Sequence, residues 1–252
     1  MFADARAALK SPWLYLSSAV ALVVLLRPTM EWIIPAWQGL IAMDVMTYYS
    51  HVDAFTGIGR FLVLFCTLPY AASFFDECRS DYARYILLHT TPNRYIASKM
   101  LAVSLSGAVA LAIPYGVISA LGVLLFQPAT ASNFTPYYNM PFWKDFILAH
   151  GAGAALAVKV GVEALYGWVW SLTGLFFACF VNHRLSVYVL PLVIYQSTCT
   201  LMPDNLFHPV YLHNANNLRY SGLWVPLLME LGYYILFGGL CVGAMKRRLR
   251  HV

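Results

Sequence analysis

A run of residues without a single charged side chain, from Met100 to Phe126, constrains this chain more than any other feature of its sequence. As an α-helix the run would be roughly 40 Å long, whereas the hydrocarbon core of a bilayer is about 30 Å thick. Other apolar runs along the chain do not alternate between apolar and polar residues, as the strands of a membrane barrel do. The sequence therefore predicts an all-α, polytopic membrane protein.

Composition supports this class, because 60% of the residues are apolar and only 11% are charged. Soluble domains have about 45–50% and about 25%, respectively. We expect one transmembrane domain over residues 1–252 with six transmembrane helices. The predicted spans are approximately 13–30, 57–75, 99–126, 161–181, 185–202 and 223–245.

The segments outside these spans are predicted to lie at the membrane interfaces. Phe2–Ser11 mixes apolar and charged residues and is expected to form an N-terminal interfacial helix. The apolar stretch after it lacks a small-residue cleavage pattern, which favours a retained span over a signal peptide. On the outer side, residues 28–56 are too interrupted by proline to span. Residues 142–160 predict a short re-entrant or amphipathic helix, and 203–222 a polar loop.

Orientation follows from the lysines and arginines. Eleven of the sixteen fall on one side of the predicted spans. They are Arg6, Lys10, Arg79, Arg84, Arg94, Lys99, Arg184, Lys246, Arg247, Arg248 and Arg250. The positive-inside rule therefore predicts that this side and both chain termini face the cytoplasm. We expect the protein to lie in the inner or plasma membrane of the cell. Because these charges are divided among short loops, they do not form a nucleic-acid-binding patch.

Catalytic signatures are missing from the sequence. It has no GxxxxGK[ST] phosphate loop, no HExxH zinc motif and no GxSxG elbow. We therefore predict no catalytic residue, no metal site and no cofactor in this chain.

The inner loop between the second and third predicted spans carries more information than a loop needed only for orientation. From about Phe74 to Leu88 it has helical spacing, with Tyr82, Tyr85, Ile86 and His89 on a semi-apolar face. A charged face adds Asp76, Glu77, Arg79, Asp81 and Arg84. Pro92 ends this helix and a new one leads into the third span. Such a mixed surface is typical of docking onto a soluble partner.

Residues Phe74–Lys99 contain an acidic residue after the second span, a Tyr-Ile-Leu-Leu helix and then the pattern T-x-P-x-R-x-x-x-x-K. In these features they resemble the inner loop of type-2 ABC exporter permeases. The six-span plan with an N-terminal interfacial helix resembles this family over nearly the whole chain. The resemblance implies a membrane-spanning permease subunit that pairs with a second permease copy or homologue. A separate ABC ATPase subunit would bind ATP and Mg²⁺ and drive export.

In that family the inner loop holds the helix that couples to the ATPase. The resemblance therefore implies a set of ATPase contacts in this loop, and the short turn before the fifth span implies a smaller second contact. The loop candidates are Glu77, Arg79, Asp81, Arg84, Tyr85 and Arg94, and the turn candidates are His183 and Arg184.

Ionisable residues within predicted spans are costly and usually face protein or water. Glu230, Glu163 and Arg60 are therefore candidates for a gate or a substrate contact, with Arg60 as a possible structural partner of Glu230. Lys159 and Glu163 are four residues apart and can pair along one helix face. Gly239 and Gly243 form a GxxxG pattern, which we interpret as close packing within the chain.

Two other classes of function stay open. One is an integral membrane enzyme that acts on lipids, and the other is a non-transporting scaffold or sensor component with the same fold. Neither the substrate, nor the direction of transport, nor homodimer versus heterodimer can be inferred from the sequence.

Overall fold

The computed structural model describes residues 2–41, 43–56, 58–129, 141–201, 208–212 and 222–250. Within these ranges the chain forms helices joined by turns and short loops, together with an isolated β-bridge between Asp44 and Gln127. The helices are α1 (Phe2–Leu9), α2 (Pro12–Trp37), α3 (Val45–Thr56), η1 (Ile58–Arg60), α4 (Leu62–Thr67), α5 (Ser73–Arg79), α6 (Tyr82–His89), α7 (Pro92–Leu125), α8 (Pro141–His150), α9 (Ala152–Ala178), α10 (Arg184–Leu201), α11 (Pro209–Leu212) and α12 (Trp224–Leu249). The all-α class is confirmed.

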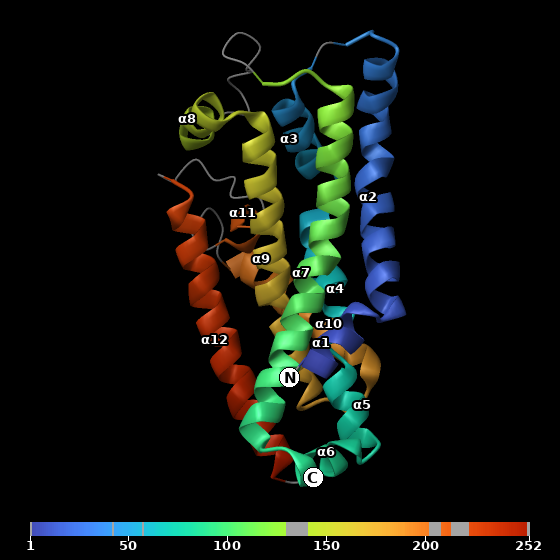
Figure 1. Ribbon diagram of the computed structural model, residues 1–252, viewed down its shortest axis with the longest axis vertical. Helices are drawn as coiled ribbons and strands as arrows, with labels where there is room; N and C mark the ends of the chain where they lie inside the picture. The colour runs from blue at the N-terminus through green and yellow to red at the C-terminus, as the bar shows by residue number, and fades with distance from the viewer. Residues whose placement is uncertain are drawn as a thin grey trace.

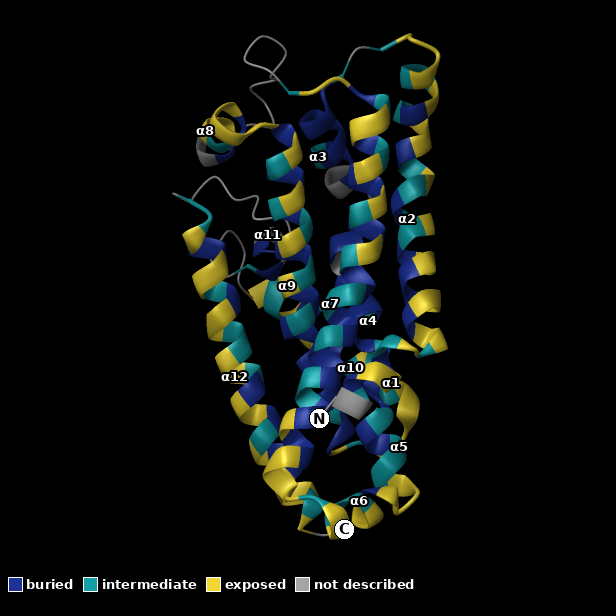
Figure 2. Cartoon of the chain, viewed as in Figure 1, coloured by how far each residue is buried: buried dark blue, intermediate teal, exposed yellow. Residues whose placement is uncertain are grey.

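Four helices, α2, α7, α9 and α12, are long and apolar enough to cross a membrane, and they run along the long axis in Figure 1. The chain is thus a multi-pass membrane protein. In the most apolar 18-residue stretch of each helix, 50% is buried in α9, against 22% in α2. The pair α7 and α9 therefore forms the centre of the bundle, whereas α2 and α12 flank it with exposed faces (Figure 2) that carry many large apolar side chains.

The contact between α7 and α9 depends on two glycines. A Cβ atom built on Gly107 would lie 2.5 Å from the carbonyl oxygen of Gly167, and one built on Gly167 would meet the carbonyl oxygen of Gly107. The two backbones are thus in direct contact, which only residues without a side chain allow. By contrast, nothing lies within 4 Å of a Cβ on Gly239 or Gly243 in the described part of the chain. The interpretation of that GxxxG pattern as packing within the chain is wrong.

The second predicted span is not one continuous helix. It consists of η1, α4, a turn that contains Pro69, and α5. Proline has no N–H, so the helical hydrogen bond from residue 69 to the Phe65 carbonyl cannot form. Ser17 of α2 donates its hydroxyl to that carbonyl at 2.6 Å instead. The break is therefore satisfied by a neighbouring helix rather than by water.

A second proline break is satisfied in the same way. Pro114 lies inside α7 and leaves the Ala110 carbonyl without its helical donor. The neighbouring serine of α2, Ser18, donates to the Ala110 carbonyl at 3.3 Å. Two adjacent hydroxyl groups of α2 thus serve two carbonyl groups that prolines have released, one in α4 and one in α7.

Helix boundaries differ from the predictions at several further points. Helix α2 continues through Pro28 and Pro35 to Trp37, because a proline inside a membrane helix is tolerated where packing re-satisfies its surroundings. The short helix predicted within residues 142–160 is α8, which is separated from α9 by Gly151 at a φ of +84°. Helix α10 matches the fifth prediction but lies outside the group of four long apolar helices. Most of the predicted loop 203–222 lies outside the described residues.

Helix α1 forms where the sequence predicts it and packs one face on the bundle. Ala5 and Ala8 are buried, while Arg6 and Lys10 are exposed. Both the beginning of α1 and the end of α12 lie in the lower part of Figure 1, toward α5 and α6. We refer to this part of the molecule as the α5–α6 end.

Candidate functional site

The inner loop forms two helices rather than the single helix that its spacing predicts. Helices α5 and α6 are separated at Ser80 and Asp81. The Ser80 hydroxyl donates to the Asp76 carbonyl at 2.8 Å, and Asp81 adopts a left-handed conformation with φ of +57°. A serine hydroxyl bonded back to the preceding turn and a left-handed residue are both typical of a helix end. The prediction that Pro92 separates the loop from the third span is confirmed, since it begins α7.

One face of α6 is exposed and rich in apolar side chains. Tyr82, Tyr85 and Leu88 are exposed to 52%, 58% and 79%, although the helix also buries Ala83. The Tyr82 and Tyr85 rings stack at 6.1 Å, and His89 meets the Tyr85 ring edge-on at 5.1 Å. These ring contacts fix the relative positions of the aromatic side chains on α6, most of which is drawn as exposed in Figure 2.

Charged side chains surround this face. Of the predicted contacts, Arg79, Asp81, Arg84, Tyr85 and Arg94 are all exposed. We define the α6 surface as the residues Arg79, Asp81, Tyr82, Arg84, Tyr85, Leu88 and His89. An exposed apolar patch with a charged rim is typical of a site for another protein.

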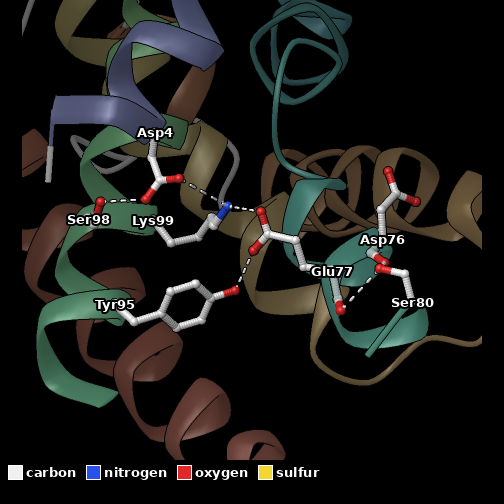
Figure 3. A network of polar contacts seen from close by, with 7 residues as sticks. All are labelled: Asp4, Asp76, Glu77, Ser80, Tyr95, Ser98 and Lys99. Atoms are coloured by element: carbon white, nitrogen blue, oxygen red, sulfur yellow. Dashed lines mark hydrogen bonds and ion pairs between the residues drawn. The ribbon is translucent and has the colours of Figure 1, made fainter. Parts of the chain in front are cut away.

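Glu77 lies apart from the α6 surface. Its carboxylate points into the bundle, where Lys99 Nζ of α7 lies 2.6 Å from Glu77 Oε1 (Figure 3). The Tyr95 hydroxyl donates to the other carboxylate oxygen. The Lys99 side chain is fully buried and that of Glu77 is only 15% exposed. Glu77 therefore connects α5 to α7.

Lys99 has a second acidic neighbour on α1. Asp4 Oδ1 lies 4.0 Å from Lys99 Nζ, and Ser98 donates a hydrogen bond of 2.5 Å to Asp4 Oδ2. The Tyr70 ring also faces the ammonium group, at 5.1 Å. Loss of one partner of a buried ion pair leaves an uncompensated charge and typically costs about 3–5 kcal/mol. Three helices that are distant in sequence, α1, α5 and α7, thus meet at one buried lysine.

The second predicted ATPase contact, the turn at His183 and Arg184, lies beside the inner loop. Arg184, at the beginning of α10, lies 3.5 Å from Asp76 of α5, and both side chains are about half exposed. His183 next to it is exposed as well. An exposed pair of this type contributes little stability. Its main significance is that both candidate contact regions belong to one continuous part of the surface.

The end of α12 adds positive charge to this part of the molecule. Lys246, Arg247 and Arg248 are exposed in its last turn, and Arg248 is close enough to Cys78 of α5 to lower its pKa. Burial outweighs this effect and raises the pKa of the Cys78 thiol to about 11. The α5–α6 end is therefore strongly basic around the aromatic α6 surface.

The gate candidates lie in a different part of the bundle. Glu163 of α9 and Glu230 of α12 are both fully buried. The Trp170 ring contacts the Tyr233 and Phe237 rings of α12 at 5.5 and 5.1 Å in the same region. Together they form a polar and aromatic centre between α9 and α12. The side chain of Arg60 lies outside the described residues, so its predicted pairing with Glu230 stays a prediction.

Helix α10 is attached to this centre by Tyr195. Tyr195 donates to the Gly59 carbonyl in η1 at 2.6 Å, and its ring meets Trp170 edge-on at 5.2 Å. Near the opposite end from α5 and α6, the Lys159 ammonium lies 4.5 Å from the centre of the Trp143 ring in α8 and 5.7 Å from that of Tyr49 in α3.

Sequence reasoning did not predict the groups around Lys99. Lys99 itself was assigned to the charged side of a membrane interface, where lysine is common. A usable signal was present, because Tyr95, Ser98 and Lys99 occupy one face of α7 by their helical spacing. Asp4 carried no local signal of this kind, since its partners are more than ninety residues away.

Comparison of the chain with protein-family models matches none of them, and comparison with curated proteins gives no significant match. The function of the chain is therefore inferred from its own residues and their geometry.

Proposed function

We propose that the chain is the membrane-spanning permease subunit of an ATP-driven exporter of the type-2 ABC family. The observation that carries the proposal is the α6 surface, an exposed aromatic and charged helix face that directly precedes the central membrane helix α7 in the chain. A separate ATPase subunit would dock there and bind ATP and Mg²⁺, with no cofactor held by this chain. Two permease copies, or this chain and a homologue, would complete the transporter.

The proposed topology has six spans. Helix α10 and the segment from η1 to the first residues of α5, about 57–75, would add two crossings to α2, α7, α9 and α12. Both termini and the α5–α6 end would then face the cytoplasm, because most lysines and arginines lie on that side.

The contacts indicate a path along which motion of the docked ATPase would reach the spans. Displacement of α6 would act on α5 and reach α7 through the Glu77–Lys99 pair. The direct backbone contact between Gly107 and Gly167 would carry the movement from α7 to α9. The buried residues Glu163 and Glu230, and Arg60 in η1, are then the proposed gate or substrate contacts, since α9 and α12 frame that centre.

Purification of the tagged protein from its native membrane tests the proposal. We expect a stoichiometric subunit with nucleotide-binding motifs to accompany the wild-type chain. Reversal of charge by Arg84→Glu on the α6 surface should lower the amount of this subunit or its ATP hydrolysis at least about tenfold, because charge reversal at a docking interface costs several kcal/mol.

Lys144→Glu is the matched control, because Lys144 is an exposed basic residue on α8, away from the α6 surface. It should leave the complex unchanged. Absence of any nucleotide-binding subunit, or full activity of the Arg84→Glu complex, would contradict the proposal.

A further inference from the structure

Lys99 is one of two lysines with side chains that are almost completely enclosed among the described residues of this chain, and it lies where three helices meet. The other is Lys159, which faces the Trp143 and Tyr49 rings toward the α3–α8 end. A buried ammonium group is retained only where partners compensate the loss of its hydration. At Lys99 these partners come from α1 and α5. Helix α1 is distant from α7 in the chain, and α5 is connected to α7 only through the short helix α6.

We infer that Lys99 is the positioning residue that joins α1 and the α5–α6 pair to α7 as one unit, so that displacement of the α6 surface moves α1 together with α7. The mechanical consequence rests on the proposed function, whereas the joining itself is a property of the isolated chain.

Geometry supports a single centre rather than two separate attachments. Glu77 approaches the ammonium group from α5 and Asp4 from α1, while the Tyr70 and Tyr95 rings lie 5.1 and 5.8 Å from it (Figure 3). Tyr95 and Ser98, which flank Lys99 on the same face of α7, bind the same two carboxylates. Each acid is therefore held both by Lys99 and by a hydroxyl group of α7.

The Glu77–Lys99 ion pair and the Tyr95–Glu77 hydrogen bond are the polar links between α5 and α7, beside the apolar contact of buried Phe74 with the Tyr95 ring at 6.3 Å. The connection α6 is exposed over most of its length, and only Ala83 within it is buried. The Arg184–Asp76 pair binds α5 to α10 but is half exposed and weak. Removal of the Lys99 charge should therefore release α5 and α6 locally without unfolding the apolar centre of the bundle.

Limited trypsin digestion of the purified protein in detergent measures this release. Trypsin can cut after three exposed arginines, Arg6 in α1, Arg79 in α5 and Arg84 in α6. Cleavage within a helix requires the helix to open first. Lys99→Met should accelerate cleavage at all three arginines by roughly tenfold, because both acidic partners lose their shared counter-charge.

The single acidic variants separate the two attachments. Asp4→Asn should accelerate cleavage at Arg6 alone, and Glu77→Gln cleavage at Arg79 and Arg84 alone. The double variant Glu77→Gln with Lys99→Met should cleave at Arg79 and Arg84 no faster than Lys99→Met, because both changes remove one interaction. Lys159→Met, the loss of the other buried lysine, should leave all three rates unchanged.

A second readout distinguishes positioning from simple support of the fold. In the complex with the co-purified ATPase, Lys99→Met should retain the bound subunit, because no residue of the α6 surface is changed, but lower substrate-stimulated ATP hydrolysis. Three results would overturn the inference. The first is an unchanged cleavage rate in Lys99→Met, and the second is faster cleavage at Arg79 and Arg84 without faster cleavage at Arg6. The third is a rate increase in the double variant that equals the product of the increases in the two single variants. Failure of Lys99→Met to fold leaves Asp4→Asn and Glu77→Gln as the deciding variants. Absence of an ATPase would overturn the proposed function but not the cleavage result.

Discussion

At the scale of single residues, the arrangement depends on polar groups that compensate for one another across helices. Ser17 and Ser18 donate to the Phe65 and Ala110 carbonyl groups, which Pro69 and Pro114 leave without helical donors. In the interior of a membrane protein such a carbonyl cannot turn to water instead. The serine pair therefore makes both proline positions tolerable.

Ser17→Ala should destabilise the protein by about 1–3 kcal/mol, because it leaves a buried acceptor unsatisfied. The change is measured as a lower thermal unfolding temperature in detergent. Ser106→Ala is the matched control, since the Ser106 hydroxyl is equally buried but donates to Val103 within its own helix, where no proline has removed the helical donor. Equal effects of the two substitutions would show that Ser17 has no special role.

Cys78 provides a test that depends on pH. Because burial raises the pKa of its thiol to about 11, the reactive thiolate forms only at high pH. The alkylation rate of the Cys78 peptide, followed by mass spectrometry, should keep rising toward pH 11 in the folded protein. After denaturation it should level off near the ordinary value of about 8.5.

The sign of the accompanying stability change follows from linkage. The folded state holds the Cys78 proton to higher pH than the unfolded state does, so this group favours folding less as pH rises from the ordinary thiol pKa to about 11. An alkylation profile that is the same before and after denaturation would show that the thiol is not shielded.

How far the sequence predicts individual residues depends on the range of their partners. The exposure of Arg79, Arg84 and Tyr85 follows from the helical spacing of the loop itself. The burial of Lys99 does not, because a lysine in front of an apolar run is typical of a membrane interface. Its actual surroundings are made by Asp4 and Glu77, which approach from other helices.

At the scale of helices, the best predictions come from uninterrupted apolar runs with clear boundaries. The loop helix ends before Pro92 as expected, although α7 begins at Pro92, ahead of the span predicted from residue 99, and α12 extends only slightly beyond its predicted span. The second span was predicted as continuous because its composition is apolar, but Pro69 outweighs composition when α2 offers a donor for the released carbonyl. Close packing was expected at Gly239 and Gly243, whereas it occurs at Gly107 and Gly167. Spacing alone cannot show which glycine faces another helix.

The α7–α9 contact makes its own prediction. Gly107→Ala should destabilise the protein by about 1–3 kcal/mol, because the added methyl group would meet backbone atoms, which cannot rotate away. The measurement is again the thermal unfolding temperature in detergent.

Gly116→Ala on the same helix is the control, because nothing in the described structure lies within 4 Å of a Cβ at that position. Alanine there should be neutral or stabilise the protein by roughly 0.5–1 kcal/mol, since it restricts the unfolded chain and favours a helix. A Gly107→Ala protein as stable as Gly116→Ala would contradict the close approach of the two backbones.

At the scale of the whole molecule, the two ends of the bundle differ in chemistry. The α5–α6 end combines the aromatic α6 surface with exposed arginines and lysines from α5, α10 and α12. At the α3–α8 end, Lys159 is instead enclosed between aromatic rings, while Lys144 on α8 is exposed. This asymmetry favours a soluble partner at the α5–α6 end, and the six-span topology with a cytoplasmic α6 remains a prediction that depends on it.

Site-specific photocrosslinking at Tyr85 tests the central claim most directly. A photoreactive amino acid at this exposed position should crosslink to one protein with nucleotide-binding motifs in native cells. The same group at Leu148, exposed on α8, should not. Crosslinks from Tyr85 to lipid alone, or to the same protein from both positions, would contradict the assignment of the α6 surface as the ATPase docking site.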